Sequence, residues 1–245
     1  MRSVLLSCLF VISGSMLLAE PTDGFVTDLN LGLTLNRGNT ENSLINAGLQ
    51  TRNIMESADF RASLAYNYGR TTRNNSEDAN STFTSTDNTK AEVQYNHLFS
   101  ERVYGLVAFS AFRDELAEIQ YRILTGPGLG YFLVRNEIWS LAVEAGISYL
   151  VEEVDNEAED YAVFRFAQIY ERDLSENASV WQNLEYLPES EDFENYLLNF
   201  EIGARAKLNG NLSLRVVLTQ RYDNTPAAGN DRSDWSLVSG ISYRL

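Results

Sequence analysis

The sequence predicts an all-β fold, a transmembrane antiparallel up-and-down β-barrel of about 12 strands, within a range of about 10 to 14. Apolar and polar residues alternate from Phe25 to Leu245, and no segment has the periodicity of a helix. The alternating segments are also close to the ~10 residues that a tilted transmembrane strand needs. These segments are residues 25–35, 43–52, 59–69, 89–98, 103–112, 119–133, 139–151, 161–171, 179–187, 193–206, 212–222 and 234–245.

Residues 139–151 show the alternation clearly. Trp139, Leu141 and Val143 occupy one face of this segment, whereas Ser140 and Glu144 occupy the other. Successive side chains of a strand point to opposite faces, so the segment has one apolar and one polar face. In a membrane barrel the apolar face contacts lipid and the polar face lines the interior.

A secreted, soluble β-sandwich is the competing architecture, because its strands alternate in the same way. The segments here are longer than the roughly five or six residues typical of soluble strands. Many of the 13 tyrosines and three tryptophans lie near segment ends, as in the aromatic girdles of membrane barrels. These observations favour the barrel.

The N-terminal residues 1–19 have the layout of a secretory signal peptide. Arg2 precedes an apolar run that ends at the small residue Ala19. A lipoprotein signal ending at Cys8 is the alternative, although Cys8 precedes the end of the apolar run. We therefore predict a signal peptide at 1–19, a single barrel domain at 20–245, and export to the cell outer membrane.

The charge balance excludes one class of partner. Removing Arg2 from the 19 basic residues leaves 18 against 34 acidic ones. Nucleic-acid binding needs basic patches for phosphate, so we expect no nucleic-acid partner.

The connections between the segments differ along the chain. Every second connection is short, for example 97–102, 134–138, 173–178 and 207–211. The intervening ones include a polar stretch at 70–88 and acidic stretches at 152–160 and 188–192. Short turns at one end and longer loops at the other are typical of outer-membrane barrels.

Several short motifs, in order, relate the chain to a known family. They are Asn36-Arg37-Gly38-Asn39-Thr40, Tyr121-Arg122, Gly126-Pro127-Gly128-Leu129-Gly130-Tyr131 and Arg221-Tyr222-Asp223-Asn224-Thr225-Pro226. With them, the chain resembles the salt-induced outer-membrane proteins, a family without an established activity. The resemblance implies an outer-membrane barrel and brings no catalytic residues.

An outer-membrane barrel contacts outer-membrane lipid and lipopolysaccharide, and its last strand meets the barrel-assembly machinery. We expect these partners for this chain. Outer-membrane strands usually end in Phe or Trp, whereas this chain ends in Leu245. Tyr243 and Ile241 keep the alternation that the machinery recognises.

Little in the sequence points to an enzyme, a metal site or a cofactor. The single histidine, His97, falls in the lipid-facing phase near a short turn, which favours an interfacial residue over a catalytic one. Gly126, Gly128 and Gly130 are spaced by two, unlike a nucleotide-binding loop, so we interpret them as places of close packing. Pro127 suggests a local bulge or bend. We predict no catalytic residue, no bound metal and no cofactor.

The acidic stretch at 152–160 admits two interpretations. Its carboxylates could hold Ca²⁺ or Mg²⁺, or share divalent ions with lipopolysaccharide. It lacks the glycine of a calcium loop, so a solvated and mutually repelling loop is favoured.

Charges in the inward phase are the best functional signal. Ionisable groups there must be paired or hydrated, so they form either a salt-bridged interior or the wall of a water-filled channel. We select as candidate lumen-lining residues Arg61, Glu92, Arg122, Glu144, Arg165, Glu171, Glu201, Arg205, Arg215 and Arg221; Lys90, Glu185, Asp234 and Arg244 share the phase.

These charges lead to three hypotheses. The first is a narrow channel for passive permeation of small hydrophilic solutes. The second is a closed structural or surface-interaction barrel, in which the interior charges neutralise one another. The least favoured is a lipid-active membrane enzyme, which would depend on His97.

Overall fold

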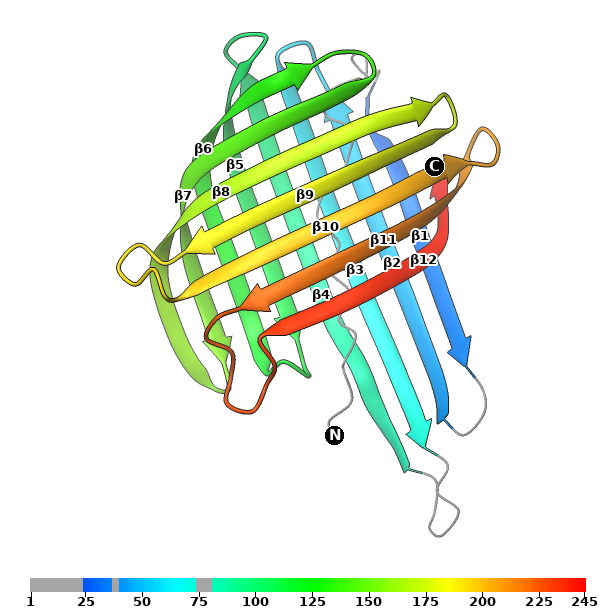
Figure 1. Ribbon diagram of the computed structural model, residues 1–245, viewed down its shortest axis with the longest axis vertical. Coiled ribbons are helices and arrows are strands. Elements are labelled where there is room, and N and C mark those ends of the chain that lie inside the picture. The colour runs from blue at the N-terminus through cyan, green and yellow to red at the C-terminus, as the bar shows by residue number, and fades with distance from the viewer. Residues whose placement is uncertain (1–23, 37–39, 74–80) are drawn as a thin grey trace.

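The protein is a closed barrel of twelve antiparallel strands, in a computed structural model that describes residues 24–36, 40–73 and 81–245 (Figure 1). Each strand pairs with its neighbours in sequence, and the last pairs with the first. The predicted all-β barrel is thus confirmed. The strands are β1 (Val26–Asn36), β2 (Thr40–Ile54), β3 (Ala58–Arg73), β4 (Ser81–Leu98), β5 (Val103–Asp114), β6 (Ile119–Arg135), β7 (Trp139–Val154), β8 (Glu157–Ser175), β9 (Ala178–Pro188), β10 (Tyr196–Lys207), β11 (Leu212–Asp223) and β12 (Ser233–Arg244).

Within those described ranges, no helix has the length and apolar character needed to cross a membrane. The predicted signal peptide at 1–19, including Cys8, lies outside the described residues, as do Arg37, Gly38 and Asn39 of the first family motif.

The outer surface carries an apolar belt between aromatic residues. On β7, Trp139 and Tyr149 both point outward, ten residues apart. At about 3.4 Å per residue and a tilt of about 45°, they are separated by about 24 Å along the barrel axis. This distance matches the roughly 25 Å apolar band of transmembrane barrels. Outward rings also contact one another at one barrel end, where Tyr196 lies between Tyr186 and Tyr222.

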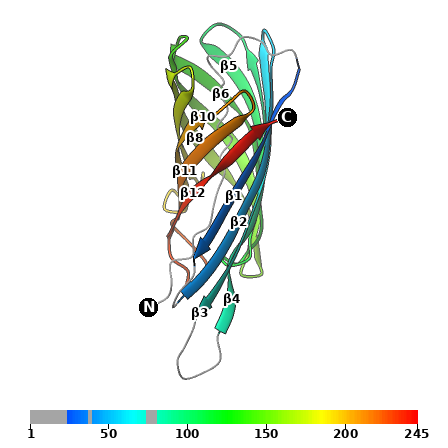
Figure 2. The ribbon, with the colours of Figure 1, turned by 90° about the vertical axis from the view of Figure 1, so that its right-hand side faces the viewer.

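The two ends of the barrel differ in their connections. Strand β1 begins, and β12 ends, at the end where the connections span residues 55–57, 99–102, 136–138, 176–177 and 208–211; we call it the short-turn end. The opposite, long-loop end carries the longest connections, including 189–195 and 224–232. The prediction of a loop at 70–88 is largely wrong, because β3 continues to Arg73 and β4 starts at Ser81. These extended strands pair with each other and project beyond the rest of the barrel (Figure 2).

The prediction of an acidic loop at 152–160 is also wrong. Strand β7 continues to Val154 and β8 starts at Glu157, so the connection is the two-residue turn Asp155-Asn156. Both turn residues have positive φ, as tight hairpin turns with right-twisted strands require. The carboxylates therefore alternate between the two faces of a hairpin, and Glu152 points inward toward Arg122.

The barrel is flattened into two walls, β1–β6 and β7–β12, whose strands cross at a large angle (Figures 1 and 2). The walls meet at the β6–β7 and β1–β12 corners. Glycines allow close backbone approach there: a Cβ on Gly126 would collide with the Ile147 carbonyl oxygen, and one on Gly240 with that of Leu31. Of the bulge or bend predicted at Pro127, the bulge is absent, because the β6–β7 register is the same on both sides of it, although the pairing with β7 is interrupted at Gly126 and Pro127.

Candidate functional site in the barrel lumen

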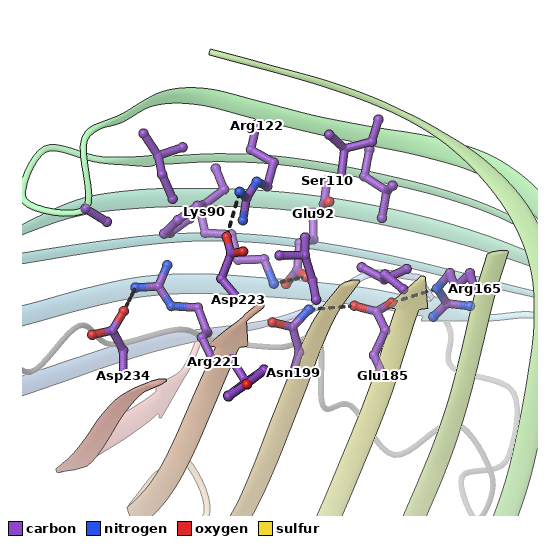
Figure 3. Close-up of a pocket in the computed structure, with 18 of the residues that line it drawn as sticks. Lys90, Glu92, Ser110, Arg122, Arg165, Glu185, Asn199, Arg221, Asp223 and Asp234 are labelled. Carbon is purple, nitrogen blue, oxygen red and sulfur yellow. Dashed lines mark hydrogen bonds and ion pairs between the residues drawn. The ribbon is translucent and has the colours of Figure 1, made fainter. Parts of the chain in front are cut away.

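The lumen contains a cavity of about 570 Å³ that is lined from both walls (Figure 3). Its lining includes many inward-facing charges of both signs. Six of the ten predicted lumen residues border it: Arg61, Glu92, Arg122, Glu144, Arg165 and Arg221. A smaller cavity of about 40 Å³ lies next to Glu171 and Arg205. The remaining two residues meet at Trp181, whose indole N–H donates to Glu201 while the Arg215 guanidinium lies 5.1 Å from its ring centroid.

Arg165 on β8 joins its two neighbouring strands. Its Nη1 lies 2.7 Å from the Glu144 carboxylate on β7, and its Nε lies 2.7 Å from the Glu185 carboxylate on β9. Asn199 on β10 donates to the other oxygen of Glu185. The guanidinium therefore lies between two inward carboxylates of neighbouring strands and balances their charge. Figure 3 shows its contact with Glu185.

Two arginines span the lumen near the long-loop end. Arg122 on β6 lies 3.0 Å from Asp223 on β11, besides pairing with Glu152. Arg221 on β11 lies 3.0 Å from Asp114 on β5 and packs 4.4 Å from the Phe112 ring centroid. The Arg122–Asp223 and Arg221–Asp114 contacts hold the two walls together, because each connects strands that are not neighbours in the sheet. Figure 3 shows the first of these two contacts.

A row of amides crosses one wall at the level of Asp114. Asn46 donates to Asn67, and Asn67 donates to Asn88, each over 2.7 Å. Asn88 in turn donates to Asp114 over 3.4 Å. The row ends in the Asp114–Arg221 pair, so the cross-lumen contact is anchored to four consecutive strands.

The two cavities share part of their lining. Arg61, Ile169 and Asn183 line both of them. The Arg61 Nε is 2.8 Å from Asp59 Oδ2. Asn183 is buried, and neither polar atom of its side chain has a partner in the protein. We call these three shared residues the neck; two of them are polar, so water or a solute between the cavities would meet hydrogen-bonding groups there.

Several partners of the predicted charges lie outside the segments in which the inward phase was assigned. Asp114 and Asp223 are the last residues of their strands, two positions and one position beyond the predicted segments, and Glu152 was assigned to a loop. Tyr104 lies near a segment end, where the sequence predicts interfacial aromatic residues, yet its ring lies inside the barrel over Gly130. Extending each alternation by one or two residues would have found the three carboxylates.

Tyr104 offers a test of the interior network. Its hydroxyl donates to Glu144 over 2.7 Å, and its ring packs against Phe132. We expect Tyr104→Phe to lower the free energy of unfolding by about 1 kcal/mol, because one hydrogen bond is lost while the ring contacts remain. Urea titration of the barrel in detergent micelles measures this change. An unchanged free energy of unfolding would mean that the hydrogen bond from the Tyr104 hydroxyl to Glu144 stabilises the fold no more than hydrogen bonds to water do.

The other residues considered for chemistry lie apart from the lumen or pack structurally. His97 is exposed on the outer face near a short turn, with its ring against Phe99. The predicted close packing occurs at Gly130, which faces the Tyr104 ring. Among the described residues, no three His, Cys, Asp or Glu side chains form a group that could hold a metal ion.

Comparison with known proteins identifies the family. Residues 29–244 match the family described as "Protein of unknown function, DUF481". The chain belongs to this DUF481 family. No curated protein sequence is similar enough to this DUF481 chain to count as a relative.

Solved structures show that the DUF481 chain has the fold of outer-membrane barrels. It is similar to the NanC porin, with 9% identity and a TM-score of 0.54, over 90% of this chain and 100% of the porin. It is also similar to the COG4313 outer membrane channel from Pseudomonas putida F1, with 11% identity and a TM-score of 0.51, over 96% of this chain and 100% of the channel. At these identities the similarity concerns the fold alone.

Proposed function

We propose that this DUF481 protein is a narrow outer-membrane channel for passive permeation of small hydrophilic solutes. The observation that carries the proposal is the cavity of about 570 Å³ lined by charges from both walls. Buried charges of this number are stable when they border water, whereas a filled, dry interior favours apolar side chains. The fold shared with a porin and an outer-membrane channel supports the same function.

The mixed signs of the lining predict weak charge selectivity. Arg122, Arg165 and Arg221 each lie beside at least one carboxylate. A pore selective for one sign of ion is lined by a ring of the opposite sign, which the balanced pairs do not provide. The solutes best suited to this lining are neutral or carry both charges.

Conductance in planar bilayers tests the channel directly. The wild-type protein should give discrete conductance steps with little preference between cations and anions. Glu92→Gln should shift the reversal potential toward anions, because Lys90 loses its paired carboxylate inside the cavity. Glu137→Gln, in an exposed turn, is the matched control and should leave it unchanged. Absence of steps in repeated insertions would contradict the proposal.

A closed structural barrel is the second candidate. The neck formed by Arg61, Ile169 and Asn183, and the cross-lumen pairs of Arg122 and Arg221, favour it. This candidate predicts no solute flux from the wild type and a loss of stability when an arginine is truncated. Small-solute swelling of proteoliposomes distinguishes the two candidates, since only the channel gives swelling.

A further inference from the structure

The small cavity of about 40 Å³ lies between the two walls, in the half of the lumen nearer the short-turn end. Its lining includes Arg52 and Arg61 from one wall and Arg205 from the other. A buried water needs roughly 10–15 Å³ of cavity volume. The cavity therefore has room for a group of about three heavy atoms.

Arginine is paired with arginine on both walls beside this cavity. Arg52 on β2 lies directly opposite Arg61 on β3 in the strand register. Arg205 on β10 lies directly opposite Arg215 on β11 in the same way. Like charges directly opposite each other on neighbouring strands are destabilising. An anion held between the walls would offset this repulsion.

The carboxylates beside the cavity leave one positive charge uncompensated. Arg205 and Arg244 share a single carboxylate, that of Asp28, over 3.7 and 3.2 Å. The other arginines of the lining have a carboxylate each, Arg61 that of Asp59 and Arg52 that of Glu171. The charges that line the cavity, together with their ion-pair partners, are therefore four guanidinium groups and three carboxylates. One monovalent anion would balance them.

Hydrogen-bond donors without partners border the same cavity. Arg61 Nη2, Arg205 Nε and Asn183 Nδ2 are buried and have no partner among the described residues. The Gln50 amide accepts from Arg215 through Oε1 over 3.3 Å, which leaves its Nε2 as a further donor without a partner. Arg61 is 4% exposed and Asn183 is 6% exposed. Because a buried donor left without an acceptor is destabilising, this set of donors indicates a bound acceptor.

We propose that the small cavity is a binding site for the carboxylate group of a small monovalent anion. A carboxylate is planar and accepts parallel hydrogen bonds from the donors of a guanidinium group. Its three heavy atoms match the volume of the cavity, and its single charge matches the surplus. Phosphate is larger and more highly charged, and chloride lacks the two separate oxygens. The site needs no solute flux, so it does not depend on the proposed channel.

Isothermal titration of formate into the purified barrel in detergent micelles tests the site. At constant ionic strength, with a bulky sulfonate as the other anion, the wild type should bind formate saturably and phosphate more weakly. Arg205→Gln should weaken formate binding at least about tenfold, because a charged donor and the surplus charge are both lost. Lys207→Gln is the matched control, since Lys207 is exposed on the same strand and does not line the cavity. It should change the affinity less than about twofold.

Asn183→Leu tests the site without removing a charge, and it serves also if Arg205→Gln fails to fold. The Asn183 side chain has no hydrogen-bond partner among the described residues, so its replacement breaks no hydrogen bond within the barrel. Without formate, the free energy of unfolding should therefore stay the same or rise. The affinity for formate should nevertheless fall about two- to tenfold, the effect of one neutral hydrogen bond. A purely structural role of Asn183 would not change this affinity.

Three results would overturn the proposal: no saturable formate binding by the wild type, tighter binding of phosphate or chloride than of formate, or a formate affinity unchanged by both Arg205→Gln and Asn183→Leu. Conductance in planar bilayers separates this proposal from the channel. Saturable formate binding by a barrel that gives no conductance steps supports the site and contradicts only the channel. Conductance steps from a barrel that binds no formate overturn the site and leave the channel standing.

Discussion

Replacing Arg165 with alanine is expected to lower the free energy of unfolding by about 3 kcal/mol or more. The guanidinium is 10% exposed and lies 2.7 Å from Glu144, which is 1% exposed, and 2.7 Å from Glu185. Its removal leaves two carboxylates near each other without their shared cation. Tyr104 and Gln94 still donate to Glu144, but neutral donors compensate less than a positive charge does.

Urea titration in detergent micelles measures this loss, and the chain offers a matched control. Arg113 pairs with Glu115 on the outside, with both side chains more than half exposed. Arg113→Ala should therefore cost less than about 1 kcal/mol. Adding Glu144→Gln and Glu185→Gln to Arg165→Ala should recover part of the loss, because the unpaired charges are removed. Equal effects of the two arginine replacements would show that lumen water screens Arg165 as fully as bulk solvent does.

The comparison of Arg165 with its partners shows how far the sequence could predict this protein. A strand alternates strictly, so the phase of Arg165 or Glu144 follows from its neighbours without knowledge of the pairing. The barrel and the inward position of all ten selected charges follow from this rule. Contacts between neighbouring strands, such as Arg165 with Glu185, also require the register, which alternation does not specify.

The cross-lumen contacts could not be predicted from alternation at all. Arg122 meets Asp223, and Arg221 meets Asp114, only because the barrel is flattened and its walls approach each other. The flattening depends on backbone approach at the corners, where the sequence shows only glycines in the inward phase. Gly126, Gly128 and Gly130 were interpreted as places of close packing, which is correct, but the neighbour that each one admits became evident only in three dimensions.

The second large effect is expected at the β6–β7 corner, where Gly126→Ala should prevent correct closure of the barrel. The added Cβ would fall on the Ile147 carbonyl oxygen and lie 2.5 Å from the Ser148 Cα. Both atoms belong to the backbone of the paired strand, so β6 and β7 must separate to make room. We expect a cost of about 3 kcal/mol or more, at the upper end of overpacking effects.

Heat-modifiability on gels and urea titration together measure closure and stability at this corner. Gly48→Ala is the control, because its Cβ would lie 3.5 Å from the nearest atom, an ordinary contact. Gly146→Ala should behave like Gly126→Ala, since its Cβ would meet the Pro127 carbonyl from the opposite strand over 2.5 Å. Wild-type folding of Gly126→Ala would contradict the close approach. Because the corner sets the distance between the walls, separation of β6 and β7 should also break the Arg122–Asp223 contact. Asp223→Asn should therefore lower the free energy of unfolding less in the Gly126→Ala background than in the wild type.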